Sequence, residues 1–421
     1  MKSKISIGLV FKFIILGISW TMAYNLAFLQ YTLYDPLLET FQCTNAQLGF
    51  LLTIFGIFNI LGAPIGGWLS DKFNFKVIYV GSMVVIGAFS AVLLFNSSYT
   101  TAIFVWIGLG IGALLMNYPA HVKIIHAIAT EGNAGKYFGF NESFCGVGGI
   151  IISALVLYVF NRSANAVGGI HAVVVVNTIL CFVVALANWF ILRDVKVEKN
   201  ENDAKEKISG KDFLIVLKSP KTWILALGIF SVYTCACSMS YFTPYYTAAF
   251  GGTVTIAGAL AVIRLYGMKL IGGPIGGALS DKLKSPSKVL ILVNGLIIIC
   301  YAAAMLLNGG AASLFIALIL LVAIVVYMGK GSYYAVSEEL NIPQKYAATS
   351  VGIAAALGFS PDIFIFVLIG HWIDKYGVTG YRYTFIFQIC IAALGICASL
   401  LGLRFKKKNA AQKTPPAENA G

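Results

Sequence analysis

Two copies of one sequence motif decide the fold of this chain. Residues 59–73 read NILGAPIGGWLSDKF, and residues 269–283 read KLIGGPIGGALSDKL. The copies begin 210 residues apart, half of the 421-residue chain, and agree at nine of fifteen positions. Chance similarity between apolar segments exchanges Leu for Ile, but it does not reproduce a proline, three glycines, a serine, an aspartate and a lysine in register. The chain therefore contains an internal repeat of two halves.

The composition around the repeat is that of a membrane protein. Hydrophobic residues make up 59% of the chain and charged residues 11%, and the mean hydropathy is +0.84. Soluble domains carry about 25% charged residues. This composition would leave an apolar surface in water, which excludes a soluble domain, a disordered chain and a disulfide-stapled secreted domain.

Twelve apolar runs are long enough to cross a bilayer, which takes about 20 residues in a helix. None alternates with a period of two residues, which excludes a transmembrane barrel. We predict an all-α membrane protein with twelve transmembrane helices in two six-helix bundles. The spans lie near residues 8–33, 46–69, 77–95, 101–122, 137–160, 169–192, 222–247, 255–279, 289–307, 312–334, 347–373 and 382–404.

A charged stretch after the sixth span, RDVKVEKNENDAKEKISGKDF, divides these spans into six and six. It mixes both signs of charge and has few apolar residues, which is typical of a solvated linker. We expect an N-terminal bundle at 1–193, a cytoplasmic linker at 194–220, a C-terminal bundle at 221–405 and a cytoplasmic tail at 406–421.

The positions of Lys and Arg predict the orientation. With both termini cytoplasmic, 22 of the 30 Lys and Arg residues lie on the cytoplasmic side, and only Arg162, Lys375 and Arg382 lie in the opposite loops. Positive residues concentrate in cytoplasmic loops. We therefore expect a multi-pass protein of the cell inner membrane with both termini inside, and the net charge of +13 needs no nucleic-acid partner.

The first copy of the repeat resembles the signature of the major facilitator superfamily (MFS), G-x-L-a-D-r-x-G-r-k. Residues 67–76 read GWLSDKFNFK, with Asn74 at the place of the second glycine, and residues 277–282 read GALSDK. Asn tolerates the left-handed backbone that a glycine there can adopt. Parallel six-helix repeats are known from transporters. The resemblance implies the MFS fold, and it extends loosely to bacterial organophosphate and nitrate porters.

The resemblance also implies a gating role for this motif, whose contacts close one end of the protein in one conformation and break in the other. The alternative is a purely structural tight turn. Gly66 and Gly276, like the glycines after them, are expected to allow close helix approach. A shorter echo, GHWIDKY at 370–376, stands at the outer end of span eleven. The gating residues that we predict are Gly67, Asp71, Lys72, Gly277, Asp281 and Lys282.

Ionisable residues inside spans are costly and suggest function. Arg264 is deep in span eight and is either a ligand for an anionic group or one partner of a structural ion pair, for example with Asp362. Lys330 in span ten is a second candidate ligand. Asp362, after the helix-loosening Pro361, and Glu142 in span five are candidates for proton coupling. We expect Glu338 and Glu339 to face solvent.

Aromatic residues follow one face of the first span, where Trp20, Tyr24 and Tyr31 stand at i, i+4 and i+11. The resemblance implies that spans one, four, seven and ten line a central cavity. Tyrosines suit such a cavity because they present both a ring and a hydroxyl group. With Arg264 and Lys330, the predicted substrate-binding residues are Tyr24, Tyr31, Tyr118 and Tyr241.

These features predict a secondary active transporter that moves a small solute by alternating access, with a proton or another coupling ion. Because cations outnumber acids within the spans, we expect an organic or inorganic anion. The alternatives are an exporter of apolar or cationic compounds and a membrane sensor with a transporter fold. No phosphate-binding G-x-x-x-x-G-K-[ST] motif is present, and the four histidines are scattered, so we expect no enzyme activity, cofactor or metal site.

Overall fold

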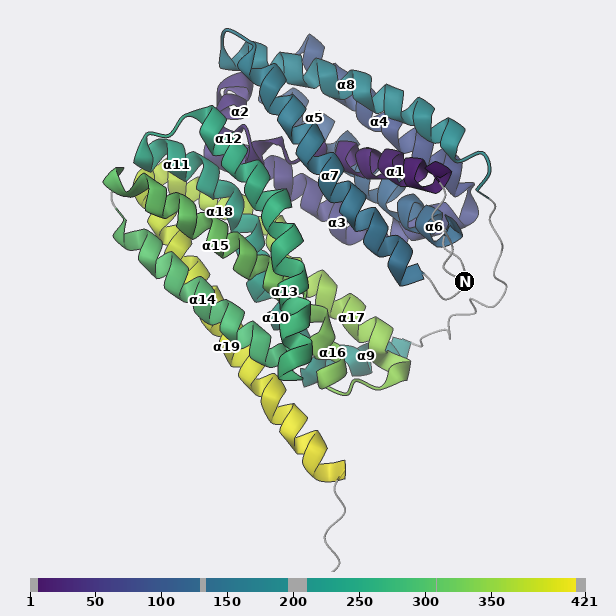
Figure 1. Ribbon diagram of the computed structural model, residues 1–421, viewed down its shortest axis with the longest axis vertical. Coiled ribbons are helices and arrows are strands. Elements are labelled where there is room, and N and C mark those ends of the chain that lie inside the picture. The colour runs from purple at the N-terminus through teal and green to yellow at the C-terminus, as the bar shows by residue number, and fades with distance from the viewer. Residues whose placement is uncertain (1–6, 129–133, 196–209, 308, 414–421) are drawn as a thin grey trace, which may run out of the picture. The chain divides into compact units, whose positions relative to one another are not determined.

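The computed structural model describes residues 7–128, 134–195, 210–307 and 309–413 (Figure 1). Within these ranges all regular structure is helical, and twelve helices are long and apolar enough to cross a membrane. The predicted fold class and number of spans are confirmed. Much of the predicted linker (196–209) and the end of the tail (414–421) lie outside the described residues.

The first half of the chain contains the first six spans and a short helix, α2, between spans one and two. The fourth span is built from α5, the π-helical segment η2 and α6. The elements are α1 (Ile7–Asn25), η1 (Leu29–Tyr31), α2 (Tyr34–Phe41), α3 (Asn45–Lys72), α4 (Phe75–Phe95), α5 (Tyr99–Gly110), η2 (Ile111–Asn117), α6 (Tyr118–Ile128), α7 (Ala134–Asn161) and α8 (Ala166–Ile191).

The second half contains six further spans, several of which are interrupted. The elements are α9 (Gly210–Lys218), α10 (Pro220–Ser238), η3 (Met239–Tyr241), α11 (Phe242–Phe250), α12 (Val254–Val262), η4 (Ile263–Gly267), α13 (Met268–Leu283), α14 (Pro286–Leu306), η5 (Gly309–Ala311), α15 (Ala312–Lys330), η6 (Tyr333–Ala335), α16 (Val336–Glu339), α17 (Gln344–Gly358), α18 (Pro361–Tyr376) and α19 (Val378–Lys413).

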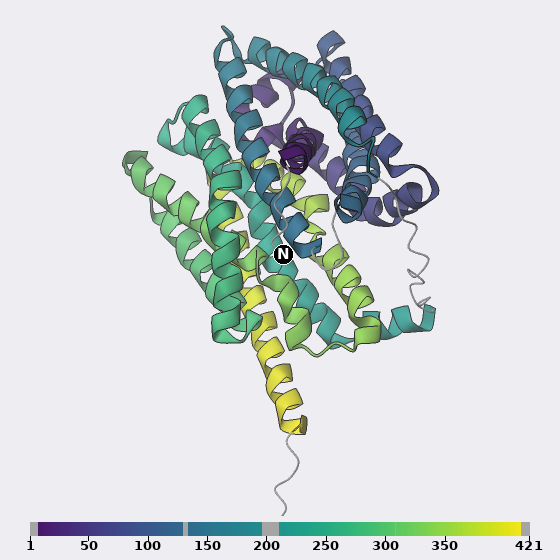
Figure 2. The same ribbon diagram turned by 45° about the vertical axis from the view of Figure 1, so that its right-hand side comes forward.

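The helices pack into two compact units, each assembled from separate stretches of the chain. The first unit combines Met1–Asp203 with Ser240–Gly267 and Asp362–Tyr381. In this unit α1 packs against α7 and α8, and α4 packs along α8; Figure 2 shows the dark purple α1 enclosed by blue helices. The first unit therefore contains helices from both halves of the chain.

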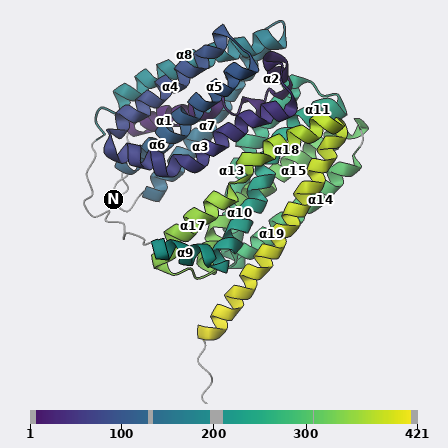
Figure 3. The ribbon, with the colours of Figure 1, turned by 180° about the vertical axis from the view of Figure 1, so that it is seen from behind.

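The second unit combines Ala204–Met239, Met268–Pro361 and Arg382–Gly421. Its most extensive packing joins α13 with α15, α10 with α17 and α14 with α15 (Figure 3). Helix α19 continues to Lys413, into the segment predicted as a tail, and α9 lies in the segment predicted as a linker.

The two copies of the repeat pack by the same device. A Cβ atom on Gly62 would lie 2.6 Å from the carbonyl oxygen of Leu114. One on Gly272 would lie 2.4 Å from the carbonyl oxygen of Ile324, and both residues of this second pair stand 210 positions after those of the first. Gly66 meets the Leu115 carbonyl in the same way. These backbones approach so closely because the glycines have no side chain.

The glycines of the predicted gating motif are not the tight ones. A Cβ atom on Gly67 or Gly277 would meet nothing within 4 Å, whereas one on Gly276 would lie 2.1 Å from the Met328 carbonyl oxygen. The expectation of close approach is therefore right for Gly66 and Gly276 and wrong for Gly67 and Gly277. The physical reason is helical period: a stripe facing one neighbour uses positions four apart, not adjacent ones.

Several helices are shorter or more broken than the apolar runs indicated. The span predicted at 8–33 ends as a helix at Asn25, and Tyr31 lies in the separate turn η1, so Trp20, Tyr24 and Tyr31 do not share one continuous helical face. The side-chain amide of Asn25 donates to Asn177 (3.0 Å) where α1 ends. The break predicted before Pro361 is present, between α17 and α18.

Candidate functional site

An aromatic group lies along α1 and the start of α6 in the first unit. The Trp20 ring packs against Tyr24, Tyr118 and His121, at centroid distances of 5.0, 5.7 and 4.8 Å. Tyr118 is 42% exposed, whereas His121 beneath it is 2% exposed. Of the predicted tyrosines, Tyr24 and Tyr118 therefore belong to one group.

Arg264 lies in a second group, at the π-helical segment η4. Its guanidinium is fully buried, packs over the ring of Phe242 (5.6 Å) and donates to the hydroxyl of Thr243 (3.3 Å). The Thr243 hydroxyl donates to the carbonyl oxygen of Tyr31 (2.8 Å). Tyr241, just before Phe242, donates to the carbonyl oxygen of Phe366 (2.6 Å).

These contacts join the second group to both halves of the chain. Arg264 and Tyr31 are linked through Thr243 in a buried junction within the first unit, and the role of Arg264, Tyr31 and Tyr241 as substrate ligands stays a prediction. A π-helical turn places one extra residue in the helix and often marks a functional segment. In this conformation the side chain of Arg264 links η4 to α11 through Thr243, and Thr243 in turn bonds η1.

Asp362 opens α18, directly after the break that Pro361 makes. It is 9% exposed, and its carboxylate accepts from the amide of Asn59 on α3 (3.1 Å). A Cβ atom on Gly56 would lie 2.5 Å from the Cβ of Asp362, so α3 and α18 are in close contact here. The predicted pairing of Asp362 with Arg264 stays a prediction.

Lys330 lies in the second unit, at the end of α15. Its ammonium group lies over the rings of Tyr233 (5.2 Å) and Tyr327 (5.7 Å), and Tyr233 packs against Phe359 (4.5 Å). The side chain is half-buried. Aromatic faces attract a cation and hold it in place. Lys330 is thus a positioned cation in an aromatic setting, and its role as a ligand stays a prediction.

The echo of the motif at 370–376 makes a helix cap in the first unit. Both carboxylate oxygens of Asp374 accept from backbone N–H groups at the start of α3, from Asn45 and Ala46 at 2.8 Å each. The Asn45 side-chain amide adds a third bond (2.7 Å), and a Cβ atom on Gly370 would lie 2.4 Å from the Asn45 carbonyl oxygen. A carboxylate at a helix N-terminus satisfies free N–H groups and the helix dipole.

Further polar contacts join the same ends of these helices. The hydroxyl of Thr247 on α11 donates to Asp35 on α2 (2.8 Å), and that of Thr255 on α12 donates to Asn161 on α7 (2.8 Å). We call this end, where α1 finishes and α3 begins, the outer end, because the predicted topology places it outside. Burial raises the pKa of Asp35 above its ordinary value, and the hydrogen bond from Thr247 opposes this.

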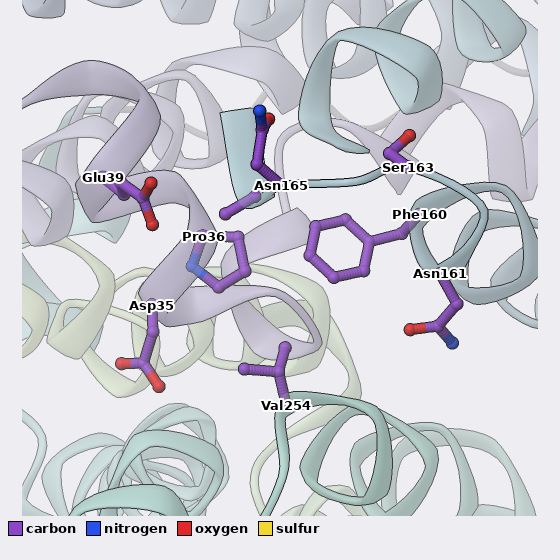
Figure 4. Close-up of a pocket in the computed structure, with 9 residues that line it drawn as sticks. Asp35, Pro36, Glu39, Phe160, Asn161, Ser163, Asn165 and Val254 are labelled. Atoms are coloured by element: carbon purple, nitrogen blue, oxygen red, sulfur yellow. The ribbon is translucent and has the colours of Figure 1, made fainter. Parts of the chain in front are cut away.

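A pocket of about 240 Å³ opens beside Asp35 at the outer end (Figure 4). It is lined by residues of α2, of the α7–α8 connection and of the start of α12. Because it lies at helix ends rather than midway along the spans, it is a vestibule and not the central cavity that the resemblance implies. Its lining is Asp35, Pro36, Glu39, Phe160, Asn161, Ser163, Asn165, Ala166 and Val254.

The remaining predicted residues lie at or near surfaces. Lys72, Asp281 and Lys282 are exposed, and the side chain of Asp71 lies outside the described residues. Glu142 is exposed on α7. No group of three or more His, Cys, Asp or Glu side chains within the described ranges is arranged to hold a metal ion.

One local expectation was wrong, and one loop has a different backbone from the one that glycine would allow there. Glu339 does not face solvent: it is 9% exposed and accepts from Ser285, from the backbone N–H of Ser287 (2.8 Å) and from Lys406 (3.0 Å). It thereby caps α14. Asn74 is not left-handed; with φ −65° it caps α4 by accepting from the N–H of Lys76 (3.0 Å). In both cases helix capping decides the conformation.

The sequence reading missed a buried network around His121. The Tyr79 hydroxyl lies 2.8 Å from His121 Nδ1, and Asn141 Oδ1 lies 3.0 Å from His121 Nε2. A signal was present, because His121 follows Tyr118 by three positions and Asn117 by four, so all three share one side of span four.

Comparison with known proteins agrees with this architecture. The sequence pattern of the Major Facilitator Superfamily matches residues 13–361. The chain belongs to this superfamily. It is a transporter for small solutes, and its family and fold are not those of an enzyme.

Among its relatives are two inner membrane proteins of Escherichia coli. YqcE is 26% identical over 95% of this chain and 96% of its own length, and YihN is 27% identical over 90% and 91%. A solved D-xylose–proton symporter superposes with a TM-score of 0.72 at 17% identity, covering 95% of this chain and 98% of its own. Both E. coli relatives match along nearly their full length, and this chain is a multi-pass membrane protein.

Proposed function

We propose that this MFS member moves a small anionic solute by alternating access, coupled to protons, with 1–193 and 221–405 as its two moving halves. The observation that carries this proposal is the set of contacts at the outer end between helices of the two halves. Alternating access requires such contacts to be specific and also breakable.

The outer end meets both requirements. Asp374 caps α3 through three hydrogen bonds, and Thr247 bonds Asp35 with one. These bonds lie at exposed or partly buried sites, so water can replace them when the end opens. The close approach of Gly370 to Asn45 gives the closed arrangement a defined register. Under the predicted topology, with both termini cytoplasmic, this arrangement is closed to the outside.

The anionic character of the solute is inferred from Lys330 and Arg264. Lys330 is half-buried, and its ammonium group lies over the rings of Tyr233 and Tyr327, whose faces attract a cation and position it. Arg264 is engaged with Thr243 in this conformation, so we assign Lys330 the first contact with the solute and Arg264 a contact after rearrangement of η4. Tyr24 and Tyr118 would supply aromatic faces from the other half.

Proton coupling is assigned to Asp362, with Glu142 as a second candidate. Asp362 is nearly buried where α3 and α18 meet, and the amide of Asn59 that bonds it is neutral. A carboxyl group that changes its surroundings as helices separate changes its proton affinity. The gating residues Gly67, Asp71, Lys72, Gly277, Asp281 and Lys282 are assigned to the opposite, cytoplasmic end.

Ligand-induced thermal stabilisation tests the substrate class. The purified protein is heated with a panel of small carboxylates, organophosphates, inorganic oxyanions, neutral sugars and organic cations. A solute present at about 100 times its Kd stabilises the native state by about 2.7 kcal/mol. We expect anions alone to raise the melting temperature, and Lys330→Gln to abolish this effect at unchanged basal stability.

Lys269→Gln is the matched control, because Lys269 is an exposed cation on α13. Stabilisation by anions that survives Lys330→Gln and Arg264→Gln would contradict the assigned ligands. Stabilisation by organic cations, lost in Glu142→Gln or Asp362→Asn, would instead support the exporter alternative.

A further inference from the structure

The end of the segment predicted as a linker is apolar. Residues 213–217 read FLIVL and form most of α9, a nine-residue helix that is too short to cross a bilayer. One side of α9 packs into the second unit against α10 and α17, and Val216 there is 2% exposed (Figure 3). Three consecutive residues are left uncovered, since Phe213, Leu214 and Ile215 are 48%, 52% and 52% exposed. A contiguous apolar surface of this kind marks a binding surface.

Two side-chain contacts hold α9 in place at the start of span seven. The indole N–H of Trp223 on α10 donates to the carbonyl oxygen of Leu217 (2.8 Å), which satisfies one of the free carbonyl groups at the end of α9. The ammonium group of Lys221 donates to the carbonyl oxygen of Asn341 (3.0 Å), so the start of α10 is also tied to the connection before α17. The uncovered face of α9 is therefore presented from a fixed position.

This position is at the surface of the membrane. Only Ser219 separates α9 from α10, with which span seven begins. Trp223, 45% exposed in the first turn of α10, combines an apolar ring with a polar N–H, and such residues are enriched where spans meet the interface. The uncovered face of α9 is thus within reach of the boundary between acyl chains and headgroups, where short amphipathic helices bind.

The charged residues beside this face are mainly basic. Lys218 is exposed and follows Leu214 by four positions and Ile215 by three, so these three residues lie on one side of α9. The sequence from 205 to 221 holds five lysines against Glu206 and Asp212. A lysine next to membrane-embedded apolar side chains extends its charge to the headgroups. This combination complements an anionic lipid surface.

We propose that α9 is an interfacial anchor, in which Phe213, Leu214 and Ile215 enter the edge of the acyl-chain layer and Lys218 binds the headgroups of anionic phospholipids. Under the predicted topology this surface is the cytoplasmic leaflet, whose anionic lipids give it a negative potential. The anchor attaches the end of the linker between the two halves to the lipid surface. It does not depend on the identity of the solute, so its test is separate from that of the proposed function.

Hydrogen–deuterium exchange of the full-length protein in nanodiscs tests the anchor. One preparation contains phosphatidylcholine alone, and the other contains phosphatidylcholine and phosphatidylglycerol in equal parts. Near an anionic surface a single lysine strengthens attachment about fivefold. Because the amides of α9 exchange only when the helix leaves the surface and opens, we expect peptide 213–219 to exchange at least fivefold more slowly, by this estimate, when phosphatidylglycerol is present.

Three variants separate the parts of the anchor. Lys218→Gln should speed exchange about fivefold with phosphatidylglycerol and leave it unchanged in phosphatidylcholine. Lys407→Gln, at an exposed lysine of α19, is the matched control and should leave both rates unchanged. Leu214→Ala combined with Ile215→Ala keeps a high helix propensity but removes the apolar contact, so it should speed exchange in both preparations. The melting temperatures should equal that of the wild type, because the changed side chains are exposed.

Three results would overturn the proposal. Exchange that is equally slow in both preparations and unaffected by Lys218→Gln would mean that protein covers this face of α9. Exchange that is equally fast in both would mean that the face stays in water. An equal acceleration by Lys407→Gln and Lys218→Gln would mean that the lipid responds to the total charge of the protein and not to a site on α9.

Discussion

The two copies of the repeat agree where helices touch and differ where charges lie. In both copies a pair of glycines four residues apart, Gly62 with Gly66 and Gly272 with Gly276, places the helix against backbone carbonyl groups of the span two later. Because the nearest atom to each of these glycines is a backbone carbonyl oxygen, which a rotamer change cannot move, a side chain at these positions is not tolerated without a shift of the helix. The repeat therefore preserves a packing surface.

The chemistry is not repeated. In the 210-residue repeat, Arg264 of the second half stands at the place of Ile54 in the first half, and Lys269 stands at the place of Asn59. The first copy is one continuous helix, α3, whereas the second is interrupted by the π-helical segment η4 before α13. We conclude that duplication fixed the architecture and that divergence of polar residues made the two halves functionally unequal.

The largest expected effect breaks the shared packing. Gly276→Ala places a Cβ atom 2.1 Å from the Met328 carbonyl oxygen, and Gly66→Ala places one 2.4 Å from that of Leu115. Forcing an extra carbon into a packed interface costs about 1–3 kcal/mol. We expect both variants to lower the free energy of unfolding by this amount, measured by thermal or denaturant unfolding in detergent.

Gly67→Ala and Gly277→Ala are the matched controls. Nothing lies within 4 Å of their added Cβ atoms. Alanine is favoured over glycine inside a helix by about 0.5–1 kcal/mol, so these variants should be neutral or slightly stabilising. Equal destabilisation by all four variants would contradict the distinction between tight and open glycines.

The next effect concerns the third occurrence of the motif, in which the aspartate caps a helix of the first half. Asp374→Ala removes three hydrogen bonds from the start of α3. Loss of such a cap costs about 0.5–2 kcal/mol, which corresponds to about 2- to 30-fold faster local exchange. Hydrogen–deuterium exchange of the peptide that begins at Thr44 measures this.

Lys375→Ala, a change at the adjacent exposed residue, should leave the exchange of that peptide unchanged. If Asp374→Ala also leaves it unchanged, the carboxylate does not hold the outer end together, and the gate would have to depend on packing between α3 and α18 alone.

The fold was predictable from sequence because its signals are long. Span length, the 210-residue repeat and the MFS-like motif each involve many residues, so errors at single positions do not matter. The break before Asp362 was predictable for a different reason, since Pro361 removes a backbone donor whatever surrounds it. The end of α1 at Asn25 was not, because an apolar run continues beyond it.

The site was less predictable because partners far apart in sequence decide it. Arg264 could be recognised as unusual, but not that Thr243 and Phe242 would hold it in a buried junction. His121 looked isolated among four histidines, since Tyr79 and Asn141 belong to other spans. Glu339 was misplaced because its caps and its lysine partner come from two other helices.

A pH effect distinguishes the two halves at the outer end, where Asp35 in the first corresponds to Tyr245 in the second. Burial raises the pKa of Asp35 above 3.8. The neutral form of its carboxyl group is therefore favoured in the closed outer end relative to an opened, hydrated one. The stabilisation by Asp35 is thus complete below pH 3.8 and is lost as pH rises through the raised pKa.

Asp35→Asn mimics the neutral acid and still accepts from Thr247. We expect the melting temperature of the wild type to fall relative to Asp35→Asn as the pH rises from about 4 to 8. Glu39→Gln, one turn further along α2 and exposed, should show no such divergence. A constant difference between wild type and Asp35→Asn across this range would mean that Asp35 has the same charge in both arrangements.

The smallest effect separates the two loops that follow the motif copies. Lys284 occupies the position of Asn74 one repeat later, yet its φ is +47°, whereas that of Asn74 is −65°. A side chain in the left-handed region costs about 1–2 kcal/mol. Glycine removes this strain, but it loses more backbone entropy on folding, which offsets part of the gain. Lys284→Gly should therefore stabilise the protein by about 0.5 kcal/mol, and Asn74→Gly should destabilise it by a few tenths because the cap on Lys76 is lost. If the two glycine variants change the melting temperature in opposite directions, the two loops use different backbone conformations at the same place in the repeat. If both variants change it in the same direction, the strain argument or the capping argument is wrong for one of the loops.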